Sequence, residues 1–214
     1  MHPIDEAYRE LLNDSSYEEL RYRAAVVGDL SYTEPSFAQD SKTYRFGNAT
    51  RYANNDSGGQ SAIWYFTDDG KILLITFTHD CAANVGGSDY ERQRSFYRGV
   101  PADLMCLAAD RTPAYENLVV ENPETGDSVL VATAVAWFDG AEWNISDGAA
   151  AFCEEEGFDP GEGTLTELDP YMLGETFTPE TYIDDYFLYP GWAGSDRETL
   201  LEEIRPIFAR HPRP

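Results

Sequence analysis

Two neighbouring apolar runs in the first half of the chain predict a β-hairpin. Residues 63–67 and 72–78 are rich in β-branched and aromatic side chains, and Thr67-Asp68-Asp69-Gly70 supplies the residues of a tight turn between them. Neither run has a polar face around Trp64-Tyr65-Phe66 or Leu73-Leu74-Ile75. A strand without a polar face is usually buried on both sides, so we expect this hairpin to lie inside a sheet that is covered by helices.

Shorter patterns predict the rest of the sheet. Runs of strand-forming residues indicate further strands over residues 42–46, 117–121, 128–138 and 142–145. The run 128–138 is the longest of these, and Asp139-Gly140 after it is a strong signal for a two-residue hairpin turn. Residues 47–60 contain several asparagines, serines and glycines, and they predict a loop that leads into the central hairpin.

Helical patterns occur near both ends of the chain. Residues 3–28 predict two helices, which separate at Asn13-Asp14, and Gly28 is expected to close the second one. Start and stop signals predict further helices over residues 88–98, 101–109, 147–156, 178–186 and from 195 onward.

Together these elements indicate an α+β domain with a mostly antiparallel sheet of about six strands, with helices at both ends of the chain and packed on the sheet. The length of 214 residues suits one domain, residues 1–214. Within it we distinguish an N-terminal helical segment (1–28), a sheet core (42–146) and an acidic, aromatic-rich C-terminal segment (147–214).

Charge adds the main functional clue. The formal net charge is −24, and residues 112–196 contain 19 Asp and Glu but no Lys or Arg. Such a one-signed stretch should repel nucleic acid and anionic membranes and should attract a cationic partner. The alternative is that the acidity maintains solubility or reflects a high-salt cytoplasm, which the presence of only two lysines would also fit.

The compartment is predicted to be the cytoplasm. Cys81, Cys106 and Cys153 are scattered and odd in number, as is typical of reduced thiols and not of a disulfide framework. We see no apolar run long enough to span a bilayer and no signal peptide.

The triplet His79-Asp80-Cys81 is the one place where a catalytic interpretation suggests itself. A histidine beside a carboxylate can act as a base and a thiol as a nucleophile, but adjacent residues of a strand point to opposite faces. We therefore predict no catalytic residue and keep His79 and Asp80 as positions to inspect. The sequence has no Cys-x-x-Cys pair, no His-x-x-x-His and no phosphate-binding loop, so no metal site and no cofactor is predicted.

Aromatic residues are dense in the acidic C-terminal segment. Tyrosines beside carboxylates suit a surface that binds a basic protein, because the aromatic rings anchor and the charges steer. The candidate partner-binding residues are Glu154, Glu155, Glu156, Tyr182, Asp184, Asp185 and Tyr186. The alternative is that many of these aromatic residues complete the core beneath the C-terminal helix.

Three stretches carry a family resemblance, which spans roughly residues 42–186. They are the hairpin that ends in Phe77-Thr78-His79-Asp80, the segment Gly99-Val100-Pro101-Ala102-Asp103-Leu104, and Trp137-Phe138-Asp139-Gly140-Ala141-Glu142-Trp143. The pattern resembles uncharacterised bacterial cytosolic proteins of the kind found as immunity partners of secreted toxins. Such relatives would usually have His-Glu-Ser where this chain has His79-Asp80-Cys81, and this departure puts a role for the triplet in doubt.

The resemblance and the charge imply a non-enzymatic binding protein that neutralises a basic toxin, such as a nuclease. Two alternatives stay open at this point. One is an uncharacterised hydrolase or metal-dependent enzyme that uses His79 and nearby carboxylates. The other is a halophilic protein whose charge reflects salt adaptation and serves no partner.

Overall fold

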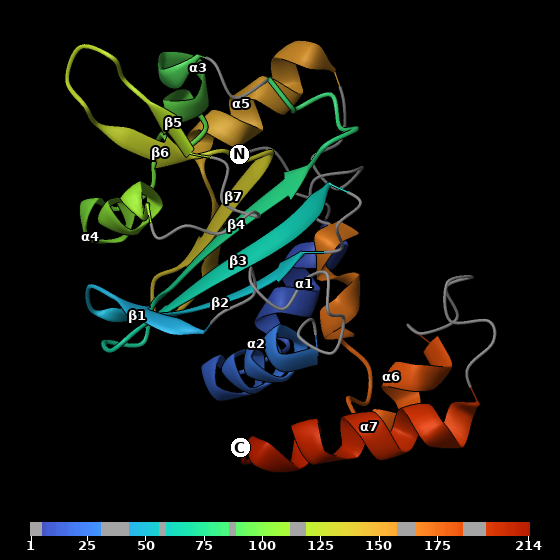
Figure 1. Ribbon diagram of the computed structural model, residues 1–214. Coiled ribbons are helices and arrows are strands. Elements are labelled where there is room, and N and C mark those ends of the chain that lie inside the picture. Colours follow the sequence, from blue (N-terminus) through green and yellow to red (C-terminus); the bar gives the residue numbers. More distant parts are fainter. Residues whose placement is uncertain are drawn as a thin grey trace.

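An antiparallel sheet organises the protein (Figure 1). The computed structural model describes residues 6–30, 43–55, 59–85, 89–111, 119–157, 166–185 and 196–214. In this part of the chain the larger sheet has six strands in the order β1-β2-β3-β4-β7-β8, and all neighbours are antiparallel. The strands are β1 (Tyr44–Phe46), β2 (Ala49–Asn55), β3 (Gln60–Thr67), β4 (Ile72–Thr78), β7 (Ala134–Phe138) and β8 (Trp143–Ile145). The α+β class and the antiparallel sheet predicted from the sequence are confirmed.

The predicted central hairpin is formed by β3 and β4, in the middle of the sheet. Ile63 lies opposite Ile75 and Trp64 opposite Leu74, and every residue of β4 is buried. Because side chains alternate along a strand, β3 directs Trp64 to one face of the sheet and Tyr65 to the other. The hairpin therefore contributes to two hydrophobic cores, as its two-sided apolar pattern predicts.

One face of the sheet is covered by what we call the α2/α7 layer (Figure 1). Its elements are α1 (Glu6–Asn13), α2 (Tyr17–Leu30), the 3₁₀ helix η2 (Thr166–Tyr171), α6 (Pro179–Asp185) and α7 (Arg197–Arg210). Leu20, Val27, Tyr171 and Leu201 pack with Trp64 in this core. The buried guanidinium of Arg23 connects α2 to the segment after η2, because its Nη1 and Nη2 donate to the carbonyls of Tyr171 and Glu175 at 3.0 Å each.

The opposite face is covered by what we call the α3/α5 layer (Figure 1). Its elements are α3 (Tyr90–Ser95), α4 (Ala102–Met105), the 3₁₀ helix η1 (Cys106–Ala109), a two-stranded sheet of β5 (Val119–Glu121) and β6 (Ser128–Leu130), and α5 (Asp147–Glu156). Phe96, Leu104, Leu107 and Val129 pack there with Ile63. All of these elements except α5 come between β4 and β7 in the chain.

The prediction of a loop over residues 47–60 is wrong for residues 49–55, and residues 56–58 lie outside the described part of the structure. Residues Ala49–Asn55 form β2, which pairs with both β1 and β3. Asn48, Asn54 and Asn55 made this segment resemble a loop. The alternation of Ala49, Arg51 and Ala53 on the face toward the α3/α5 layer is nevertheless a strand pattern, in which one buried position is occupied by a charge.

The predicted single strand over residues 128–138 is also wrong. It is divided into β6 and β7, which belong to different sheets. Hydrogen bonds of Thr133 fix the break, since its backbone N–H donates to the Thr76 carbonyl at 2.8 Å and its Oγ1 accepts from the Thr78 N–H at 3.0 Å. Both halves have the apolar composition of a strand, so the break depends on contacts with β4.

The predicted helix end at Gly28 lies two residues too early, because α2 continues to Leu30. Glycine in a helix interior costs about 1 kcal/mol relative to alanine. Here α2 packs closely on β2, and an added Cβ at Gly28 would lie 3.6 Å from the Ala53 carbonyl oxygen. The packing of this turn of α2 on β2 stabilises the helix by more than the low helix propensity of Gly28 costs.

None of the helices in the described ranges has both the length and the apolar character that crossing a bilayer requires.

Candidate functional site

Helix α5 presents three consecutive carboxylates at its C-terminal end. It begins after Ser146, whose Oγ accepts from the Ala149 N–H at 3.2 Å, and Ala149 and Phe152 pack it into its layer. Glu154, Glu155 and Glu156 are exposed, and the last turn contains no basic residue. The C-terminal end of a helix carries partial negative charge, so this position is unfavourable for glutamate. The three side chains therefore form a concentrated acidic group that helix stability does not explain.

The other predicted partner-binding residues lie on or after α6. The exposed Asp184 is engaged by Arg197, whose Nε and Nη2 donate to its two carboxylate oxygens at 2.6 and 2.7 Å. These hydrogen bonds lower the pKa of Asp184. The backbone of Asp185 belongs to α6, but its side chain lies outside the described part of the structure, as does the whole of Tyr186.

Tyr182 occupies the hydrophobic core and not the surface. It is 4% exposed, and its ring centroid lies 6.1 Å from that of Phe177 and 6.3 Å from that of Phe208. This burial supports the alternative that aromatic residues of the C-terminal segment complete the core beneath the last helix. It argues against Tyr182 as an exposed anchor for a partner.

The structure does not bring the predicted acidic residues together on one surface. Helix α5 belongs to the α3/α5 layer and α6 to the α2/α7 layer, so the sheet lies between Glu154–Glu156 and Asp184 (Figure 1). Their proximity could not be judged from the sequence, because it depends on which face of the sheet each helix covers. Of the predicted partner-binding residues, Glu154, Glu155 and Glu156 form the one compact group that the structure describes.

His79 and Asp80 lie just after β4, at the surface. Their side chains are 67% and 95% exposed, and the His79 Nδ1 lies 3.1 Å from the Asp80 Oδ1. The neighbouring Cys81 is partly buried, and this burial raises the pKa of its thiol, which disfavours the nucleophilic thiolate. In the described ranges no group of three or more His, Cys, Asp and Glu residues is arranged to hold a metal ion. These positions give no geometric support to the hydrolase or metal-enzyme alternative.

A buried polar cluster was missed by the sequence analysis. Arg51 on β2 lies between its cross-strand neighbours Tyr44 and Tyr65, and Arg51 and Asp110 are both fully buried. The Asp110 Oδ2 accepts from the Tyr44 hydroxyl at 2.5 Å and from the Tyr65 hydroxyl at 3.0 Å, and it lies 4.0 Å from the Arg51 Nε. The arginine between two alanines of β2 could have indicated this cluster, had that segment been recognised as a strand.

Two buried tyrosines should make the folded protein sensitive to alkaline pH. Burial raises the pKa of Tyr65 and of Tyr97 well above 10.0. At a pH between the pKa of each tyrosine in the unfolded protein and its higher pKa in the folded protein, the native state binds more protons than the unfolded state. The stabilisation from these tyrosines is therefore complete below about pH 10 and is lost as the pH rises further. Each group then lowers the free energy of unfolding by about 1.4 kcal/mol per pH unit. Urea unfolding between pH 8 and 11 measures the slope.

Tyr97→Phe separates this effect from general charge repulsion. The Tyr97 hydroxyl donates to the Leu130 carbonyl at 2.7 Å, so the variant loses some stability at every pH. It should nevertheless show a smaller decline above pH 10 than the unaltered protein, because one titrating group is removed. Equal declines in the two proteins would contradict the prediction.

Comparison of the chain with protein-family models, with curated proteins and with solved structures gives no match.

Proposed function

We propose that this protein is a non-enzymatic binding protein that captures a basic protein, such as a nuclease toxin, by electrostatic attraction. The observation that carries the proposal is the stretch 112–196, with its 19 carboxylic acids and no lysine or arginine. A field of this kind raises the rate at which a cationic partner is encountered and orients it during approach.

The acidic end of α5 is the part of this surface that we propose as the contact point. Glu154, Glu155 and Glu156 are exposed and adjacent, and they occupy a position that is unfavourable for the helix. Functional surfaces commonly retain such locally unfavourable arrangements. The carboxylates can accept hydrogen bonds from lysine and arginine side chains that line the cleft of an enzyme acting on nucleic acid.

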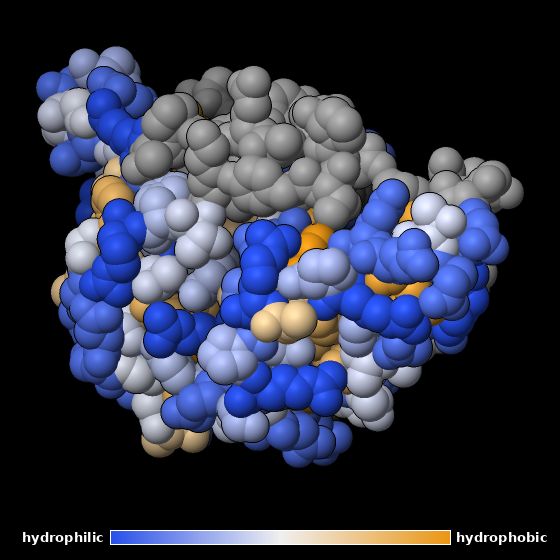
Figure 2. Space-filling model, turned by 60° about the horizontal axis from the view of Figure 1, so that its bottom comes forward, coloured by the Kyte–Doolittle hydropathy of each residue, from blue (hydrophilic) through white to orange (hydrophobic). Residues whose placement is uncertain are grey.

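The character of the remaining surface also favours a polar contact. Among the large hydrophobic residues in the described ranges, Val119 is the exposed one, at 39%. Figure 2 shows the face that comes forward from the bottom of Figure 1, and hydrophobic residues are visible there in small areas among hydrophilic ones. Binding through charges and hydrogen bonds suits such a surface better than binding through an apolar patch.

The partner test mixes the protein with basic nuclease toxins encoded beside its gene. We expect a stable complex, loss of nuclease activity, and an affinity that falls steeply as salt concentration rises, because exposed charges are screened. Absence of a complex with every neighbouring gene product at low salt would contradict the proposed function.

Neutralising the acidic end of α5 should weaken this complex. The variant Glu154→Gln, Glu155→Gln, Glu156→Gln should show slower association and a shallower salt dependence, while its melting temperature stays equal or rises. The matched control is Asp14→Asn, Glu202→Gln, Glu203→Gln, which removes the same charge from exposed positions of the α2/α7 layer. Stopped-flow association kinetics should separate the two variants. Equal losses in both would assign the attraction to net charge alone.

Thermal melts at low salt and at molar salt test the alternative of salt adaptation. A salt-adapted fold loses stability sharply in dilute buffer, because its carboxylates repel one another without screening. A melting temperature that changes little between the two conditions favours a charge that serves a partner.

A further inference from the structure

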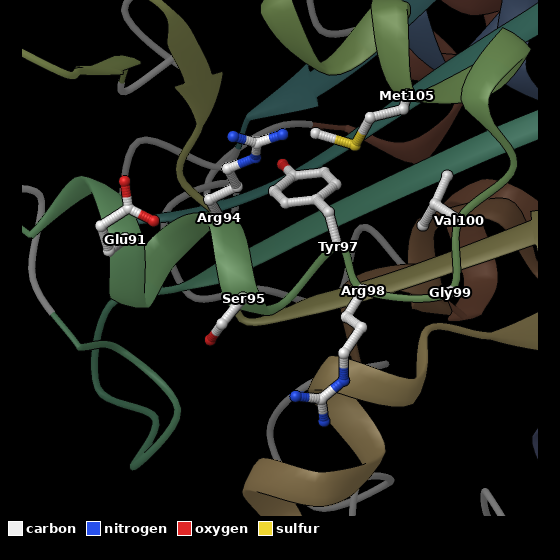
Figure 3. Close-up of a pocket in the computed structure, with 8 residues that line it drawn as sticks. All are labelled: Glu91, Arg94, Ser95, Tyr97, Arg98, Gly99, Val100 and Met105. Carbon is white, nitrogen blue, oxygen red and sulfur yellow. The ribbon is translucent and has the colours of Figure 1, made fainter.

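A pocket of about 440 Å³ opens in the α3/α5 layer (Figure 3). It lies between α3, the turn of residues 96–101 that follows this helix, and the nearby α4. The proposed capture of a basic partner does not involve this pocket. Its volume falls within the range of roughly 300–1,000 Å³ that is usual for small-molecule sites.

One side of the pocket is apolar and fixed. Tyr97, Val100 and Met105 contribute to its lining. Tyr97 is 3% exposed, and its hydroxyl is engaged by the Leu130 carbonyl, so the ring presents a wall with little freedom to rotate. Figure 3 shows the Met105 side chain extending toward this ring. The wall suits a flat, apolar body.

Two arginines add positive charge to the lining. Arg94 and Arg98 are exposed on either side of Tyr97 in the chain, and Figure 3 shows the Arg94 guanidinium beside the Tyr97 ring while Arg98 points toward α5. In the described ranges neither guanidinium forms an ion pair with a carboxylate. The Arg98 Nη2 has the Asp147 carbonyl oxygen at 3.5 Å.

The exposed arginines of the described ranges divide into those that form ion pairs and those that, like Arg94 and Arg98, form none. Five exposed arginines of the described ranges form ion pairs, namely Arg45 with Asp68, Arg111 with Glu121, Arg197 with Asp184, Arg205 with Glu180 and Arg210 with Asp29. In a chain with a net charge of −24, carboxylates to neutralise Arg94 and Arg98 are abundant. The Arg94 guanidinium lies at the cavity without such a carboxylate partner.

The backbone beneath the pocket is fixed by the start of α5. Gly99 has a φ of +93°, and a Cβ there would lie 2.6 Å from the Asp147 Oδ2. The Gly148 N–H donates to the Arg98 carbonyl at 3.2 Å, and the Ser146 hydroxyl donates to the Phe96 carbonyl. A site held in this way loses little conformational entropy on binding.

We propose that this pocket binds a small aromatic anion, whose ring lies against Tyr97, Val100 and Met105 and whose carboxylate or phosphate group is held by Arg94. The planar guanidinium group matches both kinds of anion geometrically. Glu91 at the rim and the negative field of the whole chain disfavour polyanions, so the ligand carries one anionic group. The inference concerns binding of a free small molecule and does not depend on a protein partner.

The test is isothermal titration of the full-length protein with four probes. Benzoate and phenyl phosphate combine a ring with an anion, inorganic phosphate lacks the ring, and benzyl alcohol lacks the charge. Benzoate or phenyl phosphate should bind, and either should bind more tightly than inorganic phosphate or benzyl alcohol. Equal binding of the alcohol, equal binding of inorganic phosphate, or no binding of either aromatic anion would each overturn the proposal.

Arginine variants assign the binding to the pocket. Arg94→Gln should weaken binding of the aromatic anions about tenfold, as expected when one charge-assisted hydrogen bond is removed. Arg92→Gln is the matched control, because Arg92 is exposed on the same helix but lies over the Phe152 ring, 5.6 Å from its centroid, and outside the pocket lining. Both positions are exposed, so the melting temperature should stay unchanged. An equal loss in Arg92→Gln would show diffuse charge attraction and overturn the proposal.

Discussion

Asp110→Ala should lower the free energy of unfolding by about 3–5 kcal/mol, the usual cost of breaking a buried ion pair from one side. The variant removes the carboxylate that accepts from the Tyr44 and Tyr65 hydroxyls and lies 4.0 Å from the Arg51 Nε. The Arg51 guanidinium, which is fully buried, then loses this neighbouring negative charge. A small domain has roughly 5–15 kcal/mol of stability, so the loss is a large fraction of the total. Denaturation by guanidinium chloride measures it.

Two further variants identify the cause of this loss. Tyr44→Phe removes one hydrogen bond to Asp110 and should cost about 1 kcal/mol. The double variant Arg51→Met, Asp110→Leu removes both charges together and should be more stable than Asp110→Ala, because apolar side chains then replace the whole buried pair. If Asp110→Ala alone costs less than about 1 kcal/mol, the cluster is not the buried electrostatic unit described above.

Gly148→Ala should destabilise the protein by about 1–3 kcal/mol, the usual range for forcing extra volume into a packed interior. Helix propensity alone would predict a more stable variant, because alanine is favoured over glycine in a helix by about 1 kcal/mol. A Cβ at Gly148 would lie 1.8 Å from the carbonyl oxygen of Ser95 and 2.8 Å from its carbonyl carbon. Backbone atoms cannot rotate away, so α5 has to move off the end of α3.

Chemical denaturation and the probe titrations together test this contact. Displacing α5 should also weaken the hydrogen bond from Gly148 to Arg98, so binding of aromatic anions should decrease along with stability. Ala151→Gly in the same helix is the control, because it should show only the propensity cost of about 1 kcal/mol and leave the pocket intact. A more stable Gly148→Ala variant would show that the two helices separate without penalty.

The central hairpin and most helices could be predicted because their signals are local. The apolar faces of residues 63–67 and 72–78 and the turn between them require no knowledge of the remaining chain. Strand β2 could not be predicted in the same way, since the burial of Arg51 depends on Asp110, which is distant in sequence. The break between β6 and β7 likewise depends on hydrogen bonds of Thr133 with β4.

In the candidate sites, too, some features follow from the local sequence pattern and others depend on contacts between distant parts of the chain. The exposure of Glu154–Glu156 follows from the helical pattern of α5, in which Cys153 is buried. The burial of Tyr182 and the separation of α6 from α5 depend on which layer each helix joins. The pocket beside Arg94 and Arg98 needs α3, α4 and the start of α5 to converge, and no motif in the sequence marks that convergence.

Most elements of the α3/α5 layer lie between β4 and β7 in the chain, and this position affects the order in which the sheet folds. The pairs β1–β2, β2–β3, β3–β4 and β7–β8 connect strands that are neighbours in the chain, whereas Ile72 meets Phe138 only after the intervening segment has closed on itself. Closing a long loop costs entropy before its contacts form. We therefore expect the β1–β4 meander and the β7–β8 hairpin to form early, and the seam between β4 and β7 to complete the sheet.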